Sequence, residues 1–437
     1  MSGDTIFALA TPRGRSAVAV VRMSGTGVRF ALETLVGAVP TARRASLRRV
    51  TEPGTGDLLD QAIVIWFPSP KSFTGEDMAE LHLHGGRAVL QGIVNALSGF
   101  GFRIAEPGEF TRRAFGNGKS DLTAVEGLAD LIDAQTAAQR RQAVRQMSGA
   151  LAGVAARWRF ALLDAMARVE AEIDFSDEGD VAEGGGSAPA LDALRAVASE
   201  MDGLLAGSRR SERLREGVVA VLAGPANAGK STLLNALAGR DVAIVSDRPG
   251  TTRDVLEVSL DLSGTPLTLV DTAGLRASDD LIEQEGIRRA RDRLATADIV
   301  LWLTPADQRS IFSDAPVGST VIPIATKIDS AKKGSPDDRL GVSAVTGAGI
   351  DSLLKRLALE AEALAGEASL VTRERQRLAL VRARDALGRV LSGFSDGELE
   401  LVAEDLRLSV RALEALVGRV DVEDVLDRLF ASFCIGK

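Results

Sequence analysis

The chain has 437 residues, of which 45% are hydrophobic and 26% are charged, as in ordinary soluble globular domains. A net charge of −8 argues against a surface coated for nucleic acid, and a single cysteine excludes a disulfide framework. Three tryptophans and no tyrosine argue against a stacking platform for single strands. The sequence shows no signal peptide and no run of eighteen apolar residues, so we expect a cytoplasmic protein of two to four domains.

Residues 1–118 predict an α+β domain. The runs "SAVAVVRMSG" and "QAIVIWF" are short, rich in β-branched residues and bounded by turn residues, which predicts strands. The stretch "RAVLQGIVNALSGFG" has helical spacing and ends at glycine. The stretch "ARRASLRRV" (42–50) is a local basic cluster, for which a solvated loop or strand face is favoured over nucleic-acid binding.

Residues 119–210 predict helices of a bundle, because a long stretch rich in Ala, Leu, Arg and Glu contains no proline. The segment "EGGGSAP" (183–189) interrupts it, and helical spacing then resumes. The repeating apolar positions are Leu191, Leu194, Val197, Met201 and Leu204.

Residues 211–365 predict an α/β domain. The apolar runs "GVVAVLAG", "TPLTLVDTAG", "DIVLWLT" and "TVIPIAT" are separated by helical patterns, which indicates a mostly parallel sheet covered on both faces. Residues 366–437 return to helix. The α/β domain therefore interrupts a helical one, and we expect the two helical segments to contact each other.

The stretch "GPANAGKS" (224–231) matches the phosphate-loop pattern G-x-x-x-x-G-K-[ST] between a predicted strand and a predicted helix. Its glycines let backbone N–H groups surround phosphate oxygens at a helix N-terminus. Lys230 is expected to reach the β- and γ-phosphates, and Ser231 to bind Mg²⁺. Asp271, which closes an apolar strand at "DTAG", belongs to the same Mg²⁺ shell.

The stretch "TKID" (326–329) stands where GTPases carry N-K-x-D. The carboxylate of Asp329 can accept from guanine N1–H and N2–H₂, whereas adenine offers no such donor pair, so GTP is favoured over ATP. The stretch "SAVTG" (343–347) resembles the loop that contacts the base. Thr326 replaces the usual Asn, and we expect a lower nucleotide affinity but the same base.

The stretch "PGTTRDV" (249–255) looks like the first switch, in which one threonine completes the Mg²⁺ shell. Leu275 stands where Ras-like proteins carry the glutamine that orients the attacking water. Glu283 is a candidate replacement. Spacing alone favours a solvated carboxylate in the first turn of a helix instead.

Taken together, "PANAGKST", "PGTTRD", "DTAGLR" and the terminal Cys-Ile-Gly-Lys resemble the MnmE (TrmE) family of tRNA modification GTPases. The likeness runs the whole length and includes "SFTGEDMAELHLHGG" and "AEPGEFTRRAFGNGKSDLTAVEGLADLIDAQT". It implies a folate-binding and dimerising domain (1–118), a helical domain in two parts (119–210 and 366–437) and an inserted P-loop G domain (211–365).

The resemblance implies a homodimer that works with the flavoprotein MnmG (GidA) in a heterotetramer or larger complex. The two proteins place a carboxymethylaminomethyl or aminomethyl group on C5 of the wobble uridine of certain tRNAs. The one-carbon unit comes from 5,10-methylenetetrahydrofolate or 5-formyltetrahydrofolate. The residues implied to contact the folate are Arg22, Glu80, Lys119 and Lys437.

The resemblance also implies that the G domains pair across their nucleotide faces with the help of K⁺. Asn227 and Thr251 would bind K⁺ by side chain, and Ser246 and Arg248 by carbonyl. Glu283 would then hold the attacking water, and Thr252 would join Ser231 at Mg²⁺. Lys230 and Glu283 are the implied catalytic residues, and the implied GTP contacts are Asn227, Ala228, Gly229, Lys230, Ser231, Thr232, Ser246, Asp247, Arg248, Pro249, Gly250, Thr251, Thr252, Asp271, Thr272, Ala273, Gly274, Thr326, Lys327, Asp329, Ser343, Ala344 and Val345.

Cys434, the only cysteine, has three interpretations: a small buried residue, a prenylation site or a functional thiol. Prenylation is the weakest, because Gly436 and Lys437 stand where its signal needs an aliphatic residue and usually Ser, Met, Gln, Ala or Leu. The resemblance favours a thiol near the folate site. His82 and His84 share a strand face, but packing is favoured over metal binding because no third histidine or cysteine lies nearby in the sequence.

A second function stays open on these residues. The chain could be a regulatory G protein that binds ribosome or RNA and performs no one-carbon chemistry. The phosphate loop alone does not separate the two functions, whereas the proposed folate residues have no role in a pure switch.

Overall fold

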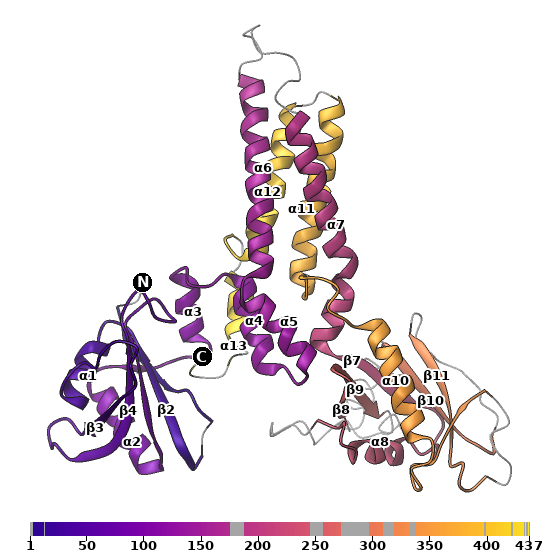
Figure 1. The fold of residues 1–437 in the computed structure, drawn as a ribbon, viewed down its shortest axis with the longest axis horizontal. Helices are drawn as coiled ribbons and strands as arrows, with labels where there is room; N and C mark the ends of the chain where they lie inside the picture. The colour runs from indigo at the N-terminus through magenta and orange to yellow at the C-terminus, as the bar shows by residue number, and fades with distance from the viewer. Residues whose placement is uncertain are drawn as a thin grey trace, which may run out of the picture. The chain divides into compact units, whose positions relative to one another are not determined.

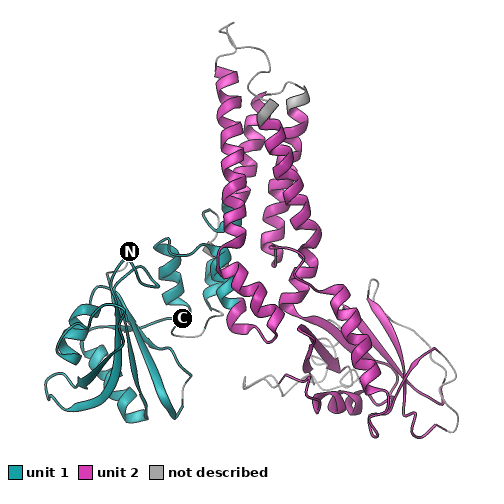
Figure 2. Cartoon of the chain, viewed as in Figure 1, with its two compact units in different colours: residues 1–129, 414–437 teal, residues 130–413 magenta. Residues whose placement is uncertain are grey.

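The computed structural model describes residues 3–12, 14–174, 188–244, 257–271, 297–308, 319–331, 338–396, 399–420, 423–431, 433 and 436. The chain forms two compact units, residues 1–129 with 414–437 and residues 130–413 (Figure 2). None of the described helices is both long and apolar enough to cross a membrane.

The first unit contains a six-stranded sheet in the order β3-β4-β5-β2-β1-β6. Strands β2, β3 and β4 of this sheet are labelled in Figure 1. Neighbouring strands are antiparallel except for β1 and β6. The strands predicted from "SAVAVVRMSG" and "QAIVIWF" lie in β2 and β4. The bounds are β1 (Ile6–Leu9), β2 (Ser16–Ser24), β3 (Ser46–Thr51), β4 (Leu58–Phe67), β5 (Met78–Gly85) and β6 (Arg103–Ile104).

The two faces of this sheet have different roles, because side chains alternate along each strand. Helices α1 (Val28–Val36) and α2 (Arg87–Gly99) pack on one face, over buried residues such as Met23, Val64 and Leu81. On the opposite face, Arg22 stands beside Glu80 in the register of β2 and β5. Alternation therefore places these two distant charged residues side by side on the face that carries no α1 or α2.

Helix α3 (Glu109–Gly116) is held by a cluster of ion pairs centred on two buried residues, Arg113 and Glu109. The Arg113 side chain is 8% exposed and donates to carboxylates of Asp4, Glu76 and Glu109. Arg103 contacts Glu109 at 2.6 Å. Burial by itself would raise the pKa of Glu109, but hydrogen bonds from Arg103, the Glu106 amide and Arg113 outweigh it and lower that pKa. The ionised cluster thus fixes α3 against the sheet.

Glu109→Gln is expected to destabilise α3 by about 3 kcal/mol at pH 7, because it leaves two arginines without a buried carboxylate. Since the folded pKa is depressed, the contribution of Glu109 is present above its ordinary value of 4.5 and is lost as pH falls through the lower folded pKa. Hydrogen exchange of the α3 amides at several pH values measures the effect.

Glu33→Gln is the matched control, because Glu33 forms an exposed pair with Arg29 at 3.4 Å. We expect this change to cost less than about 1 kcal/mol. Equal effects of the two substitutions at pH 7 would show that the α3 cluster contributes nothing beyond a surface ion pair.

The C-terminal segment of the first unit packs on its N-terminal part. Arg112 of α3 lies over the Phe430 ring at 5.2 Å, and Phe430 belongs to α13 (Glu423–Ala431). Gly108, with φ +69°, faces the Phe430 backbone so closely that an added Cβ would lie 2.8 Å from its oxygen. Residues more than 300 positions apart in sequence therefore share one packed interface.

The helical part of the second unit is a bundle of long helices (Figure 1). Helix α7 packs against both α6 and α11, so the helical segments before and after the α/β domain contact each other. Ser409 of α12 donates to the Ala383 carbonyl of α11 at 3.0 Å. The bounds are α4 (Leu122–Asp133), α5 (Ala137–Met147), α6 (Ala150–Asp174), α7 (Ala188–Glu216), α11 (Glu374–Asp396) and α12 (Leu399–Val417), with parts of α4 and α12 in the first unit.

The connector that returns from the α/β domain to the bundle, residues 366–373, is held by buried polar side chains. Ser211 of α7 donates to the Ser369 carbonyl at 3.0 Å and accepts from the Ser369 amide at 2.8 Å. Gln146 of α5 donates to the Leu370 carbonyl and to Thr372. These bonds satisfy backbone groups that burial would otherwise leave unpaired.

The α/β domain of the second unit has a six-stranded sheet in the order β12-β11-β10-β7-β9-β8. All its neighbouring strands are parallel except β8 and β9, which confirms the predicted α/β class. The bounds are β7 (Val218–Ala223), β8 (Glu257–Leu262), β9 (Thr265–Asp271), β10 (Ile299–Pro305), β11 (Thr320–Thr326), β12 (Leu340–Val342), α8 (Lys230–Ala238) and α10 (Ile350–Leu364).

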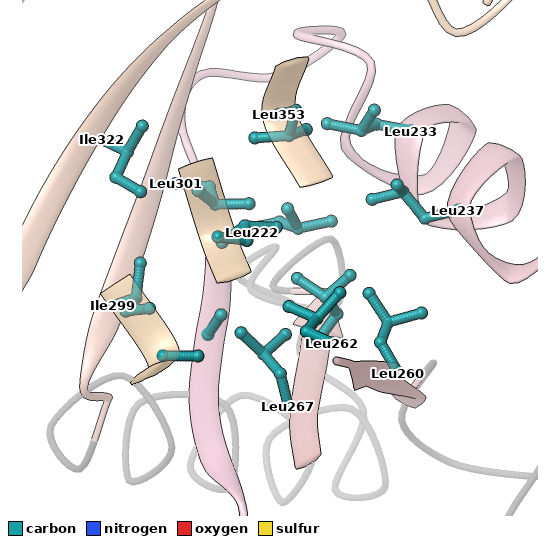
Figure 3. Close-up of a cluster of buried hydrophobic side chains, with 14 of the residues drawn as sticks. Leu222, Leu233, Leu237, Leu260, Leu262, Leu267, Ile299, Leu301, Ile322 and Leu353 are labelled. Carbon is teal, nitrogen blue, oxygen red and sulfur yellow. The ribbon is translucent and has the colours of Figure 1, made fainter. Parts of the chain in front are cut away.

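Helices α8 and α10 cover one face of this sheet. Leu233 and Leu237 of α8 and Leu353 of α10 meet strand residues such as Leu222 and Leu301 in one buried cluster (Figure 3). Strand residues of the opposite face, including Val221 and Val300, are buried as well. Burial on both faces explains why these strands are continuous apolar runs.

Candidate functional site

The phosphate loop lies between the end of β7 and the start of α8, as predicted. Gly224 has φ +136°, and an added Cβ would lie 2.1 Å from the Leu303 carbonyl oxygen, so only glycine fits there. Asn227 adopts φ +61° and Gly229 φ +92°, which turn the chain sharply into α8. The loop therefore presents backbone N–H groups at a helix N-terminus, where an anion is stabilised.

The two polar side chains at the start of α8 have different partners. Lys230 Nζ donates to the carbonyls of Gly224 at 2.9 Å and Pro225 at 3.0 Å. Ser231 Oγ donates to Asp271 Oδ2 at 2.5 Å, because β9 lies beside β7 and ends there. A hydroxyl and a carboxylate are oxygen ligands that Mg²⁺ prefers, so these two residues fit the predicted metal.

The predicted base loop follows β11 on the same edge of the sheet. Lys327 has φ +58°, and Ser343, which follows β12, is fully buried. The Ser343 side chain, the Asp329 backbone and the Ser330 hydroxyl hold the pKa of the Asp329 carboxyl below its usual range, and Ser330 Oγ donates to Asp329 Oδ2 at 3.1 Å. Asp329 is therefore ionised at neutral pH and able to accept two hydrogen bonds. Val345 in the neighbouring loop is 82% exposed.

Several predicted GTP-site residues lie outside the described residues. They are Ser246, Asp247, Arg248, Pro249, Gly250, Thr251, Thr252, Thr272, Ala273, Gly274 and Glu283. The described members are brought together at one edge of the sheet: Asn227, Ala228, Gly229, Lys230, Ser231, Thr232, Asp271, Thr326, Lys327, Asp329, Ser343, Ala344 and Val345.

A second candidate site is a cavity of about 280 Å³ in the first unit, on the sheet face opposite α1 and α2. Arg22 Nη2 contacts Glu80 Oε1 at 2.9 Å, and Arg22 Nη1 donates to the Gly436 carbonyl at 3.2 Å. Glu80 Oε2 lies 3.3 Å from His82 Nε2. The lining residues are Arg22, Phe67, Phe73, Met78, Glu80, Thr111 and Leu128.

The structure brings together some of the predicted folate residues but not all of them. Arg22 and Glu80 line the cavity, whereas Lys119 does not and donates to the Pro70 carbonyl at 2.9 Å. Lys437 and Cys434 lie outside the described residues. His84 bonds to Asp60, with Nδ1 at 2.8 Å from Oδ1.

Sequence reasoning missed Thr111, a buried residue of α3 that lines the cavity. Its hydroxyl is buried and has no hydrogen-bond partner among the described residues. An unpaired buried hydroxyl costs free energy, so a polar group of a ligand is a natural partner. No motif marks a lone threonine in "EFTRRAFG", and its role depends on tertiary placement.

A phosphate loop on a mostly parallel sheet, with an acidic Mg²⁺ partner and an ionised base-loop carboxylate, defines a P-loop GTPase. The chain matches the family models described as "GTP-binding protein TrmE N-terminus" over residues 5–119 and "MnmE helical domain" over residues 122–434.

Relatives match over the whole length. One from Methylobacterium sp. (strain 4-46), named tRNA modification GTPase MnmE, is 55% identical and covers 99% of this chain and 100% of its own. One of the same name from Azorhizobium caulinodans is 53% identical and covers 100% of this chain and 99% of its own. Among solved structures, the G domain of the T. maritima FeoB iron transporter is 28% identical over 33% of this chain and 99% of that chain, with a TM-score of 0.24. The chain belongs to the MnmE family of tRNA modification GTPases.

Proposed function

We propose that this GTPase uses GTP hydrolysis to drive modification of C5 of the wobble uridine in certain tRNAs. The group added is carboxymethylaminomethyl or aminomethyl, its one-carbon unit comes from a tetrahydrofolate, and the flavoprotein MnmG is the partner. The observation that carries the proposal is the junction at Arg22. Its guanidinium joins Glu80 and the Gly436 carbonyl beside one cavity, so predicted folate residues and the C-terminal motif meet in space.

The chemistry of the cavity suits a reduced folate. Such a molecule has a flat ring with N–H groups at its edge and a tail that carries carboxylates. Within the cavity, Glu80 accepts hydrogen bonds from the ring, Arg22 attracts a carboxylate, and Thr111 can donate or accept. Lys119, which lies outside the cavity lining, is assigned to the carboxylate tail on the family resemblance alone. Phe67, Phe73 and Met78 supply apolar walls. The folate supplies the one-carbon unit, while these residues bind and orient it; we assign Lys437 and Cys434 to the same site.

Equilibrium binding of 5-formyltetrahydrofolate to the full chain tests the site. We expect Arg22→Ala and Glu80→Gln each to weaken binding about tenfold or more, since each removes a charge-assisted hydrogen bond. Arg29→Ala is the control, because Arg29 is an exposed arginine of α1. A native chain that binds no folate would favour the regulatory G protein. Measuring modified wobble uridine in cells that lack this protein tests the reaction itself.

We further propose that K⁺ binds at the phosphate loop when two G domains pair. Asn227 is exposed at the tip of the loop in a left-handed conformation, which supports a role toward a neighbouring group. Asn227 and Thr251 bind K⁺ by side chain and Ser246 and Arg248 by carbonyl. A cation there neutralises charge that develops between the β- and γ-phosphates.

GTP turnover is expected to rise when K⁺ replaces Na⁺ at constant ionic strength, by about tenfold or more if the cation replaces an arginine finger. Asn227→Ala should remove most of this stimulation, measured as the ratio of the rates in K⁺ and Na⁺, so that any effect of the substitution on the loop itself cancels. Initial rates of phosphate release in the two salts measure the effect. Identical rates for the native chain in K⁺ and Na⁺ would exclude the cation from catalysis.

Glu283 is proposed to hold the attacking water, with Thr252 and Ser231 at Mg²⁺. Glu283→Ala is expected to leave GDP affinity within about twofold and to lower turnover by roughly 10²-fold, the scale of lost catalytic positioning. Stopped-flow nucleotide binding and steady-state turnover separate the two quantities. If Glu283→Ala turns over GTP at the native rate, Glu283 is not catalytic and is instead a solvated carboxylate in the first turn of a helix.

We also propose a cytoplasmic homodimer with domains at 1–118, 119–210 with 366–437, and 211–365. A largely apolar groove of about 1500 Å³ in the first unit supports pairing of two copies. It is lined by Leu9, Leu90, Val94, Ile104 and Phe433, and Ile104 is 56% exposed. Such an exposed apolar surface is typical of a protein interface.

A further inference from the structure

Thr326 joins the base loop to the phosphate loop. It is the last residue of β11 and is 4% exposed, and its Oγ1 donates to the Ala228 carbonyl at 2.7 Å. Ala228 is fully buried and stands between Asn227 and Gly229, the two residues with positive φ. The Thr326 hydroxyl therefore holds the carbonyl at the sharpest part of the phosphate loop.

A hydroxyl has one proton to donate, and here that proton is given to Ala228. The guanine atoms that remain once N1–H and N2–H₂ face a carboxylate are the acceptors O6 and N7. Donation to either would need a second proton at position 326. Asparagine has two N–H donors and could serve both the loop and the base, whereas threonine can serve only one.

We infer that Thr326 is a positioning residue of the phosphate loop and donates no hydrogen bond to the base. Selection of guanine then rests on Asp329 and on the loop that contains Ser343. This inference rests on the proposed base site. It explains how the chain tolerates threonine at position 326. The hydrogen bond to the Ala228 carbonyl, which shapes the phosphate loop, is kept, and only a hydrogen bond to O6 or N7 of the base is absent.

The test compares GDP with 7-deaza-GDP, which lacks N7, and with 6-thio-GDP, whose sulfur is a weak acceptor, on the full chain with Mg²⁺. Thr326→Val removes the hydroxyl at nearly constant volume. We expect it to weaken all three nucleotides by the same factor, about five- to tenfold, because the buried Ala228 carbonyl loses its donor. Thr326→Ser keeps the hydroxyl and is expected to stay within about twofold of the native chain for each nucleotide.

The ratio of the affinity for GDP to the affinity for each analogue should be the same in the native chain and in Thr326→Val, within about twofold. The reason is that the Thr326 hydroxyl and the base atoms O6 and N7 do not interact, so changes to them do not couple. Two results would overturn the inference. One is an analogue preference that disappears in Thr326→Val, which would mean that the hydroxyl donates to the base. The other is a Thr326→Val chain that binds every nucleotide as the native chain does.

Asp329→Asn separates this inference from the base site on which it rests. If the base site is correct, this variant should lose GDP affinity and gain affinity for xanthosine diphosphate, whose C2 oxygen accepts from the new amide. If Asp329→Asn still prefers GDP over xanthosine diphosphate as the native chain does, the base site is refuted, whatever the Thr326 variants do. If Asp329→Asn prefers xanthosine diphosphate, and the preference for GDP over its analogues also disappears in Thr326→Val, the base site is correct and only the positioning role of Thr326 is refuted.

Discussion

Gly224→Ala is expected to abolish nucleotide binding, with a loss of GDP affinity of at least about a hundredfold. A Cβ at this position would lie 2.1 Å from the Leu303 oxygen and 3.0 Å from the Leu303 carbon. Both atoms are backbone of β10, which is hydrogen-bonded to β7 and β11 and is buried, so it has no room to yield. The φ of +136° adds strain for any L side chain. Calorimetric titration with GDP measures the affinity.

Gly239→Ala is the control for this substitution. Gly239 follows α8, has φ −82° and meets no atom closer than 3.7 Å from an added Cβ. We expect its affinity for GDP to stay within about twofold, because alanine is tolerated at such a conformation. A Gly224→Ala chain that binds GDP as tightly as Gly239→Ala would show that the loop can move away from β10.

Gly436→Ala is expected to release the C-terminal motif from the first unit and to weaken folate binding by about tenfold or more, since Arg22 then loses a hydrogen-bond acceptor. An added Cβ would lie 2.6 Å from the Leu9 oxygen and 3.0 Å from the Ala10 Cα, and φ is +100°. Wobble-uridine modification should fall with folate affinity. GTP turnover in K⁺ should stay within about twofold, because no described nucleotide-site residue belongs to the first unit.

Gly101→Ala provides the matched control in the same unit. Gly101 has φ +79° but nothing within 4 Å of an added Cβ, so it carries the conformational strain without the clash. It should bind 5-formyltetrahydrofolate within about threefold of the native chain, on the scale of strain at one residue. If Gly436→Ala behaves like Gly101→Ala, the close approach of the tail to β1 has no role in the folate site.

The phosphate site could be predicted in detail because its parts are local in sequence. Residues 224–231 form one turn between one strand and one helix, so spacing alone places Lys230 and Ser231. The apolar runs of β7, β9, β10 and β11 likewise predicted a parallel sheet, since strands buried on both faces need apolar residues at every position.

The cavity in the first unit could not be predicted in this way. Arg22 and Gly436 are separated by 414 positions, and only the resemblance to a family connected Arg22 with the C-terminal motif, through Lys437. Phe73, Thr111 and Leu128 lie in three different segments and belong to no motif. Their convergence follows from the packing of α3 and of the C-terminal segment around the sheet, which residue spacing does not encode.

The amino-acid sequence by itself determined that this chain has a phosphate-binding loop, because residues 224–231 are contiguous and need no distant partner to form the turn. It also determined the class of each domain, because apolar periodicity dictates local secondary structure. Only the tertiary structure decided which hydroxyl is left unpaired in the cavity and that the proton of Thr326 is already given to Ala228. Hydrogen bonds between distant segments depend on where whole elements pack, and that placement arises from the sum of many weak contacts rather than from any one motif.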